Sequence, residues 1–241
     1  MIRKHRNHWR SKQERLKAAV LSDIHSNLPA LEAVLASVKL EGCEQTICLG
    51  DVVGYGAQPN ECLELLTSEH IPILLGNHDA AVIGRLSLEY LNTYARQAAV
   101  WTMNRLALEN IHRLALHPII IEQTVITYVH SSPSEPDLWR YIFNPTEARA
   151  AFRAFKSQVC FYGHTHIPII FTNPADDRRL INVGSVGQPR DRDPRACYGI
   201  YDTETAEFRW VRLDYDIDKT AKLIVDAGLP RFLADRLYEG I

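Results

Sequence analysis

Ile47-Cys48-Leu49-Gly50-Asp51-Val52-Val53-Gly54-Tyr55-Gly56 is the stretch on which the predicted fold depends. An apolar run reaches Asp51, a glycine precedes it, and a glycine-containing loop follows it. This order of residue types is typical of a buried strand that ends at a loop and places a carboxylate at the edge of a sheet. Many α/β proteins carry an aspartate at such a position, so this stretch alone does not define a function.

Four further stretches of the chain repeat this pattern. They are Leu21-Ser22-Asp23-Ile24-His25, Leu75-Gly76-Asn77-His78-Asp79, Tyr128-Val129-His130 and Tyr162-Gly163-His164-Thr165-His166. Each follows an apolar, strand-like run and supplies Asp, Asn or His, which are side chains that bind divalent transition metals. We therefore interpret Asp51 as a residue between two metal ions, with the other four stretches around it.

The order of the predicted elements indicates an α/β domain. Strands at 17–21, 46–49 and 71–75 are separated by helices, of which the first is expected to run from Pro29 to about residue 41. Parallel sheets bind ligands beyond the carboxyl ends of their strands, where the first three of these stretches lie. Residues 80–116 predict two helices. The second half of the chain predicts strands at 119–121, 125–129, 159–162, 169–171, 180–183, 198–201 and 208–213, a helix at 145–155 and two closing helices.

Length and composition are typical of a single soluble domain: 241 residues, 46% of them hydrophobic and 23% charged. The formal net charge of −2 gives no overall attraction to nucleic acid or to an anionic membrane. The first 17 residues differ, because they hold seven Lys or Arg and one Glu. We expect a leader at residues 1–16, either flexible or acting as a basic arm for an anionic partner such as nucleic acid. A single domain is expected at residues 17–241.

Five cysteines are scattered along the chain without a CxxC pair, which predicts reduced thiols and a cytoplasmic protein. No apolar run approaches the roughly 20 residues that cross a bilayer. The basic N-terminal region lacks the apolar stretch of a secretory signal. We therefore expect neither a membrane contact nor export.

The candidate ligands offer only oxygen and nitrogen donors, which argues against a structural zinc site closed by thiolates. One ion is assigned to Asp23, His25, Asp51 and His166, and the second to Asp51, Asn77, His130 and His164. Two ions about 3.5–4 Å apart can share a hydroxide nucleophile and polarise a phosphoryl oxygen. Manganese, iron and zinc all accept such mixed donors, and the donor types do not choose among them; we expect manganese, with iron, zinc or nickel as alternatives.

His78 remains outside both predicted ligand sets. Beside the metals it could protonate a leaving oxygen as a general acid, or stabilise charge there as an imidazolium. Asp79 either orients the ring of His78 or caps a helix. We expect Asp51 and His78 to be the catalytic residues.

Together the five stretches resemble the motifs of the calcineurin-like metallophosphoesterase family, which are DxH, GDxx(x)G, GNH(D/E), a single His after a strand, and GHxH. All five occur here in order, from Asp23 to His166. The sequence is most similar to the family's small bacterial and archaeal phosphodiesterase branch. This resemblance implies a four-layer αββα sandwich of two mixed β-sheets flanked by helices, a dinuclear metal site, hydrolysis of phosphate esters, and His78 as the catalytic acid.

Three positions depart from the pattern of that branch. Ser26 and Ser131 stand where the branch usually has glycine, and Val183 stands where it usually has proline. A glycine that needs a positive φ would be strained as serine, so the shape of these loops could differ. None of the three departures removes a predicted ligand.

The segment 184–191, Gly-Ser-Val-Gly-Gln-Pro-Arg-Asp, also matches the branch. Its backbone amides, Ser185 and Arg190 could bind substrate phosphate, because a guanidinium matches phosphate oxygens. The alternative is a structural turn in which Arg190 forms a salt bridge with Asp191 or Asp193.

From these observations we hypothesise a metal-dependent phosphodiesterase that acts on a small or nucleotide substrate. A phosphomonoesterase and a dinucleoside polyphosphate hydrolase are alternatives, the latter because Tyr55, Trp139 and Tyr141 could stack a base. A further alternative is a metal-binding scaffold without catalysis, although such relatives can lack the His that is present here as His78. The exposed sheet edges of such a sandwich would also allow a homodimer.

Overall fold

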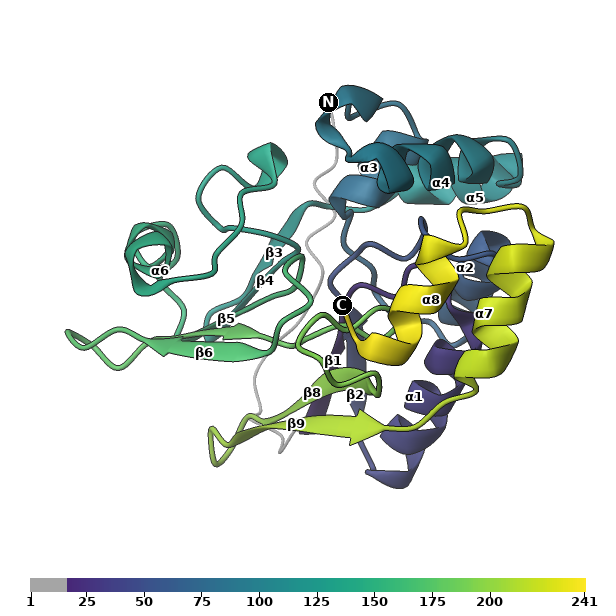
Figure 1. Cartoon of the computed structure of the whole chain (residues 1–241). Helices are drawn as coiled ribbons and strands as arrows, with labels where there is room; N and C mark the ends of the chain where they lie inside the picture. The colour runs from purple at the N-terminus through teal and green to yellow at the C-terminus, as the bar shows by residue number, and fades with distance from the viewer. Residues whose placement is uncertain (1–16) are drawn as a thin grey trace, which may run out of the picture.

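The computed structural model describes residues 17–241, so the predicted basic leader lies outside the described residues. The described chain forms two β-sheets with helices on their outer faces (Figure 1). The strands are β1 (Lys17–Leu21), β2 (Gln45–Cys48), β3 (Ile120–Glu122), β4 (Ile126–Val129), β5 (Val159–Tyr162), β6 (Ile169–Thr172), β7 (Arg179–Asn182), β8 (Ala196–Asp202) and β9 (Phe208–Leu213).

Both sheets are mixed. The first has the order β2-β1-β8-β9, in which β1 runs parallel to β2 and antiparallel to β8. The second has the order β3-β4-β5-β7-β6, with β4, β5 and β7 parallel and an antiparallel strand at each edge. The carboxyl ends of β1 and β2 therefore lie together in one sheet, and those of β4 and β5 lie together in the other.

The helices lie on the outer faces of the two sheets. They are α1 (Leu28–Leu40), α2 (Pro59–Ser68), α3 (Asn77–Val82), α4 (Thr93–Met103), α5 (Leu108–Leu116), α6 (Pro145–Ala151), α7 (Ile217–Asp226) and α8 (Phe232–Glu239), with short 3₁₀ turns η1 (Leu88–Tyr90) and η2 (Pro136–Leu138). Side chains of α1, α2, α4, α5, α7 and α8 share a core with the first sheet, whereas α6 packs on the second (Figure 1).

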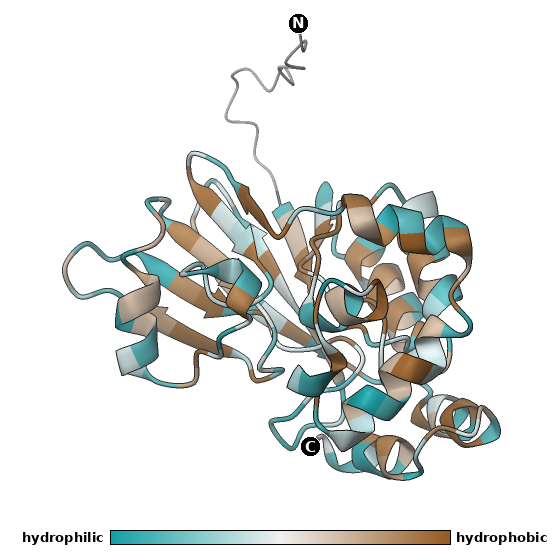
Figure 2. Ribbon diagram, turned by 90° about the horizontal axis from the view of Figure 1, so that it is seen from above, coloured by the Kyte–Doolittle hydropathy of each residue, from teal (hydrophilic) through white to brown (hydrophobic). Residues whose placement is uncertain are grey.

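Alternation of side chains along the strands produces these layers, because successive residues of a strand point to opposite faces. In β1, Ala19 and Leu21 face the helices, whereas Val20 belongs to the core between the sheets. In β5, the side chain of Phe161 enters that central core and the side chain of Tyr162 packs towards α6. In Figure 2, brown segments are interspersed with pale and teal ones along the strands. The predicted αββα sandwich is confirmed.

One of the predicted strands does not form. The run 71–75 is not a strand, because only a single parallel bridge joins Cys48 to Ile73. Pro72 has no N–H to donate, which prevents a continuous ladder there. The region 80–116 contains α4 and α5 as predicted, but it also contains η1, and α3 begins before it at Asn77.

Four of the five cysteines are buried, Cys43 is partly buried, and all five are free, as the absence of paired cysteine motifs predicted. None of the helices in residues 17–241 is long and apolar enough to cross a membrane.

Candidate metal centre

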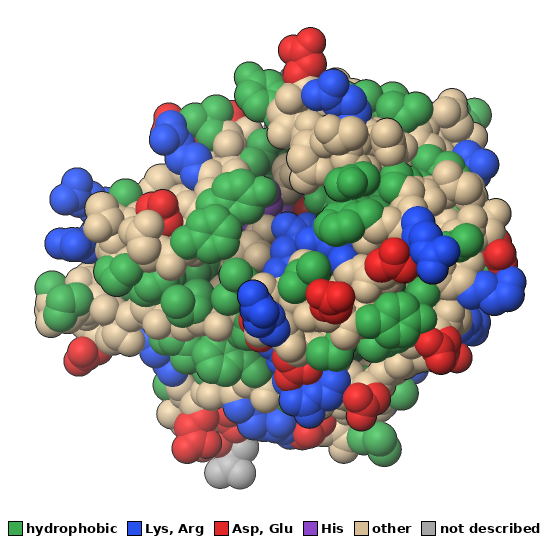
Figure 3. Space-filling view, in the orientation of Figure 1, with side chains coloured by type: hydrophobic (Ala, Val, Ile, Leu, Met, Phe, Trp, Pro, Cys, Tyr) green, Lys and Arg blue, Asp and Glu red, His purple; other side chains and the backbone are tan. Residues whose placement is uncertain are grey.

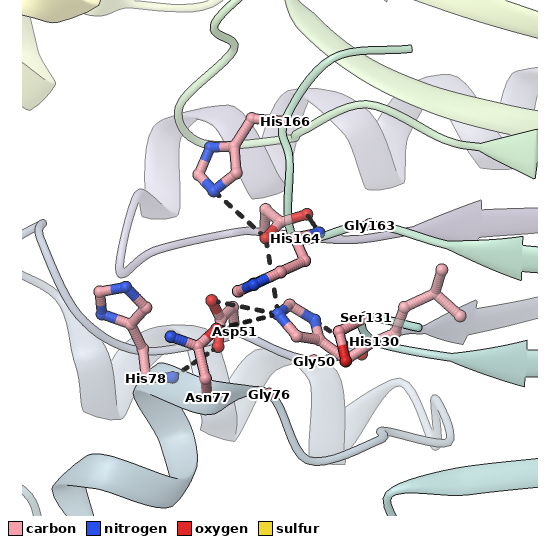
Figure 4. Close-up of polar contacts among 12 residues, drawn as sticks. Gly50, Asp51, Gly76, Asn77, His78, His130, Ser131, Gly163, His164 and His166 are labelled. Carbon is pink, nitrogen blue, oxygen red and sulfur yellow. Dashed lines mark hydrogen bonds and ion pairs between the residues drawn. The ribbon is translucent and has the colours of Figure 1, made fainter. Parts of the chain in front are cut away.

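The seven predicted ligands come together where the carboxyl ends of four strands meet. Asp23 and His25 follow β1, Asp51 follows β2, His130 follows β4, and His164 and His166 follow β5, while Asn77 opens α3. All seven side chains are buried, and the most exposed of them, Asn77, shows only 7% of its surface. Figure 4 shows the side chains of Asp51, Asn77, His130 and His164 turned towards one another.

The loops that carry these residues use an uncommon backbone conformation. Five of the predicted ligands have positive φ angles: Asp23 (54°), His25 (51°), Asp51 (52°), His164 (65°) and His166 (62°). Asp23 and His25, two residues apart, therefore reach the centre from left-handed and not from extended backbone. Such conformations cost about 1–3 kcal/mol each and persist where the surrounding structure enforces them.

Asp51 lies between two groups of donors. Its Oδ1 accepts a hydrogen bond from the backbone N–H of His78 at 2.8 Å. Its Oδ2 lies 3.7 Å from Nε2 of His25 and 3.3 Å from Nε2 of His130. One carboxylate oxygen is therefore held by the backbone, and the other faces a histidine on each side.

The first group surrounds Asp23. Its Oδ1 lies 3.3 Å from Nε2 of His166 and 3.9 Å from Nε2 of His25. The two imidazole nitrogens are themselves 3.2 Å apart. These three side chains, together with Oδ2 of Asp51, match the set predicted for the first ion.

The second group surrounds His130. Its Nε2 lies 3.3 Å from Oδ1 of Asn77, as well as 3.3 Å from Oδ2 of Asp51. Ligand atoms of His130, His164 and Asp51 all lie within 4.8 Å of one another. These four side chains match the set predicted for the second ion.

Backbone carbonyl groups fix the tautomer of each histidine in both groups. Because a carbonyl oxygen only accepts, the bonded ring nitrogen donates, and in the neutral ring the other nitrogen keeps a lone pair for the site. The bonds join Nδ1 of His25 to Val53 O (3.1 Å), Nδ1 of His130 to Leu49 O (3.2 Å), Nδ1 of His166 to Gln188 O (2.6 Å) and Nε2 of His164 to Trp139 O (2.9 Å).

These contacts fit a divalent cation. With their Nδ1 atoms donating outwards, the facing Nε2 atoms of His25 and His166 both present lone pairs, which repel unless a cation or a proton lies between them. Oδ1 of Asp23 is buried and has no hydrogen-bond partner in the described part of the chain, which is costly for a carboxylate. A bound cation would satisfy all three atoms.

The protonation states agree with this interpretation. Burial lowers the pKa of His25 and His166 well below the ordinary value, and it lowers the pKa of His164 to about 3. Neutral imidazoles are the form that binds metals. Burial alone would lower the pKa of His130, but the neighbouring carboxylate of Asp51 outweighs burial and raises this pKa to about 9. The carboxylates of the centre therefore attract positive charge.

His78 lies beside the two groups. Its ring packs against those of His25 and Tyr55, with centroids 4.9 Å and 4.5 Å away, and its buried Nδ1 has no hydrogen-bond partner within residues 17–241. A ligand atom of His78 also lies within 4.8 Å of His25 and Asp51. The ring is therefore close enough to the centre to act on a molecule bound there.

Asp79 caps the start of α3. Its carboxylate accepts hydrogen bonds from the backbone N–H groups of Gly76 (3.1 Å), Val53 (3.0 Å) and Val52 (3.4 Å). Within residues 17–241, no hydrogen bond joins it to the ring of His78. Of the two roles considered for Asp79, the structure supports the helix cap.

Two glycines of the motifs allow the carboxylates of Asp51 and Asp23 to lie directly against the backbone. A Cβ at Gly76 would lie 2.1 Å from Oδ1 of Asp51, and one at Gly163 would lie 2.5 Å from Oδ2 of Asp23. Neither position has room for a side chain, which explains why glycine precedes Asn77 and His164.

The loop that carries the predicted substrate-binding residues lies against the first group. Ser185 is fully buried, and its hydroxyl donates to Asp23 O (2.7 Å) and accepts from Gln188 N–H (2.8 Å). These contacts give Ser185 a structural role, and its predicted contact with substrate phosphate has no support in this geometry. Arg190 is partly exposed beside the site, with its Cζ 5.5 Å from the centroid of the Tyr55 ring.

The alternative for Arg190 was a structural turn in which it pairs with Asp191 or Asp193. In the structure these two carboxylates pair with other arginines. Asp191 binds Arg212, and Asp193 binds Arg195 at 2.7 Å. Among the described residues, no Asp or Glu side chain pairs with Arg190, so the predicted salt bridge to Asp191 or Asp193 does not form.

Aromatic side chains line the opposite side of the centre. Tyr141 stacks on His164 with a centroid distance of 4.1 Å, and Phe143 stacks on Tyr141 at 5.2 Å. Both outer rings are about half exposed, at 48% and 50%. Tyr55, in contrast, is buried among the histidines, so of the three predicted base-stacking residues Tyr141 is the best placed.

Comparisons with known proteins agree on one family. A sequence profile for the calcineurin-like phosphoesterase superfamily domain matches residues 16–206. The uncharacterized protein MJ0912 of Methanocaldococcus jannaschii is 40% identical over 239 residues, which cover 92% of this chain and 97% of that protein. Phosphodiesterase YfcE of Escherichia coli strain K12 is 27% identical over 202 residues, which cover 78% and 89% of the two chains.

A solved structure gives the same result in three dimensions. The crystal structure of a metallophosphoesterase from Sphaerobacter thermophilus is 38% identical, with a TM-score of 0.84, and the match covers 95% of this chain and 100% of that one. The similarity therefore includes the segment beyond residue 206, where the family profile ends.

Proposed function

Because the chain belongs to the calcineurin-like phosphoesterase superfamily, we propose that it hydrolyses a small or nucleotide phosphodiester at the two groups of donors around Asp51. It is a metal-dependent phosphoesterase, and the preference for a diester is our proposal. The main support for hydrolysis at this site is the environment of Asp51, whose Oδ2 faces His25 on one side and His130 on the other. The similarity to phosphodiesterase YfcE supports the choice of a diester.

The residues would hold two divalent ions in the sets described above, with Asp51 in both. When bound, such ions activate water for attack on phosphorus and neutralise charge on the phosphoryl oxygens. The donors are carboxylate, amide and imidazole groups, which accept manganese, iron, zinc or nickel. We propose manganese as the native ion.

His78 is proposed as the general acid. Its backbone N–H donates to Asp51, so the start of α3 is fixed to the centre and the ring is held beside it. Burial lowers the pKa of His78 to about 4, and an anionic substrate next to the ring would raise it again. Substrate binding would therefore favour the protonated ring, which can donate to the leaving oxygen.

A second candidate function is the hydrolysis of a dinucleoside polyphosphate. The observation that favours it is the half-exposed pair Tyr141 and Phe143, stacked outwards from His164. Such an exposed aromatic stack can bind a nucleobase at the edge of the centre.

The test compares three substrates after the metals have been stripped and Mn²⁺ has been added back. These are bis(4-nitrophenyl) phosphate, 4-nitrophenyl phosphate and diadenosine tetraphosphate. We expect Mn²⁺-dependent activity, highest on a diester, and a loss of at least about a hundredfold in His78→Ala, as is usual for removal of a general acid. The matched control is His112→Ala, because His112 is exposed on α5.

Three outcomes would contradict the proposal in different ways. A dominant rate on the monoester would replace the diesterase assignment, and a dominant rate on the tetraphosphate would favour the second candidate. Binding of two metal ions without hydrolysis of any ester would indicate a scaffold.

A further inference from the structure

Two arginines meet at the ring of Tyr55. The Cζ atom of Arg190 lies 5.5 Å from the centroid of this ring, and the Cζ atom of Arg236, from α8, lies 5.9 Å from it. The same ring contacts His25 and His78, with centroids 4.7 Å and 4.5 Å away. Both guanidinium groups are therefore close to the candidate metal centre. In Figure 3, Lys or Arg side chains (blue) lie in a hollow of this face, next to a histidine side chain (purple).

Neither arginine is neutralised by an acidic side chain. In the described chain, no Asp or Glu forms an ion pair with Arg190 or Arg236, and the two acidic residues nearest to Arg190 in sequence are bound to Arg212 and Arg195. The hydrogen bonds of the pair go to other groups. Nη2 of Arg190 donates to Gln188 Oε1 at 2.7 Å, and Nε of Arg236 donates at 2.5 Å to the main-chain oxygen of Ile241, the last residue of the sequence.

Arg190 is the member of the pair whose guanidinium has an unsatisfied donor. Nε of Arg190 is buried, and none of residues 17–241 offers it a hydrogen-bond partner. Burial, with the charge of Arg190 as the next cause, lowers the pKa of Arg236 to about 10. Two like charges in a partly buried site repel each other and lose hydration, and a bound anion would offset both effects.

Arg236 is held in place by the packing of α8. Leu233, Ala234 and Leu237 of this helix are buried in the core. At its end, Gly240 O accepts a hydrogen bond from Arg192 N–H at 2.9 Å, and a Cβ at Gly240 would lie within 3.0 Å of backbone atoms of Asp193. The helix is therefore fixed to the loop that carries Arg190, so the spacing of the two arginines is set by the fold.

Arg190 is the inner member of the pair. Its backbone N–H donates to His166 O at 3.3 Å, and the residue that binds its side chain, Gln188, also accepts the hydrogen bond from Nδ1 of His166. Among the described residues, no hydrogen bond joins Arg236 to a predicted ligand or to Gln188. The positive charge therefore extends outwards from the metal centre, first to Arg190 and then to Arg236.

We propose that Arg190 and Arg236 form an anion-binding subsite for a second phosphoryl group linked to the one that is hydrolysed. Guanidinium groups suit this role because their N–H groups match two phosphate oxygens at once. The proposal rests on the proposed function, and it narrows the substrate class to molecules with at least two linked phosphoryl groups, such as nucleoside diphosphate derivatives. The alternative is that the two arginines only support the docking of α8.

The first measurement uses the wild-type protein with Mn²⁺ and two ligands that it cannot hydrolyse. Methylenediphosphonate carries two phosphoryl groups and methylphosphonate carries one, and titration calorimetry gives both dissociation constants. We expect the diphosphonate to bind at least about tenfold more tightly, as one or more charge-assisted hydrogen bonds would provide. Equal affinities would overturn the proposal, whatever the variants do.

The second measurement repeats both titrations with Arg236→Gln and with Arg231→Gln as the matched control. Arg231 precedes α8, its side chain is 83% exposed, and its loss changes the charge by the same amount. We expect Arg236→Gln to remove most of the preference for the diphosphonate and Arg231→Gln to retain it. If Arg236→Gln weakened the affinity for both phosphonates equally, the arginine would act only through structure. If both variants lost the preference for the diphosphonate equally, it would act only through net charge.

Titration of the metal-free protein separates this proposal from the proposed function. A preference for the diphosphonate that depends on Arg236 but not on Mn²⁺ would support the subsite even if no ester were hydrolysed. Hydrolysis of a diester by a protein without this preference would support the function and reject the subsite.

Discussion

At the scale of single residues, the candidate centre depends on side chains held in left-handed backbone turns. Asp and His visit this region more readily than most residues other than glycine and Asn, so the ligand types themselves are compatible with it. Ser26 has the same conformation, with φ at 55°, within one of these turns. The sequence predicted strain at this position, because the family branch usually has glycine there and glycine tolerates a positive φ. The observed positive φ of Ser26 confirms this prediction.

Replacement of Ser26 by glycine should stabilise the protein. The serine hydroxyl is buried and finds no hydrogen-bond partner among the described residues, and the left-handed conformation is unfavourable for serine. Removal of both costs should outweigh the roughly 0.5–1 kcal/mol that glycine adds in chain entropy, for a net gain of about 1 kcal/mol. Urea denaturation of both proteins measures this difference.

Ser131→Gly is the matched control for that prediction. Ser131 also stands where the branch has glycine, but its φ is not positive and its hydroxyl donates to Pro136 O at 3.3 Å. This substitution should destabilise the protein by about 1 kcal/mol. If both substitutions changed the free energy of unfolding in the same direction, relief of backbone strain at Ser26 would not explain the effect of Ser26→Gly.

At the scale of elements, the sequence predicted which segments supply the ligands better than it predicted their conformation. The run 71–75 is apolar and buried, and hydrophobicity alone cannot separate a short strand from another buried segment. Asn77 and His78 consequently begin a helix instead of ending a strand. Val183 departs from the family branch in a way that the structure explains, because its N–H donates to Tyr162 O at 3.0 Å and proline could not make this bond.

The junction between β1 and β5 gives a prediction at this scale. Gly163→Ala should weaken metal binding at least about tenfold, because the new Cβ would lie 1.9 Å from Oγ of Ser22 and 2.5 Å from Oδ2 of Asp23. Relief of such contacts requires movement of Asp23, and overpacking of this kind costs about 1–3 kcal/mol. Calorimetric titration with Mn²⁺ measures the affinity.

Gly42→Ala is the control for Gly163→Ala. Gly42 follows α1 with a φ of 64°, and a Cβ there would meet no atom within 4 Å. This variant should lose some stability from the backbone conformation but bind Mn²⁺ like the wild type. Unchanged affinity in Gly163→Ala would show that Asp23 is not needed for the ion.

At the scale of the whole molecule, the candidate centre joins the two sheets. Asp23 and Asp51 follow strands of the first sheet, whereas His130 and His166 follow strands of the second. The pattern of strand ends predicted that these residues meet, and the family resemblance supplied the pairing of two sheets. Arg236 could not be predicted, because it lies on a helix outside every motif and reaches Tyr55 only through the packing of α8.

This arrangement predicts that metal ions stabilise the fold as a whole. Ligands from both sheets would bind the same ions, so unfolding would release them. At a metal concentration a hundred times the dissociation constant, one ion contributes about 2.7 kcal/mol, which corresponds to a rise of about 5–10 °C in Tm for a domain of this size. Thermal unfolding with Mn²⁺ and with a chelator measures the shift within each variant.

Asp51→Asn should lose most of this shift, because both proposed ions share that carboxylate while the amide oxygen can still accept the hydrogen bond from His78 N–H. His112→Ala, on the exposed face of α5, should retain the full shift. Each variant is compared with its own metal-free form, so a change in intrinsic stability does not affect the result. A shift in Asp51→Asn as large as in the wild type would place the bound metal elsewhere, because ions held jointly by the two sheets need the carboxylate that lies between them.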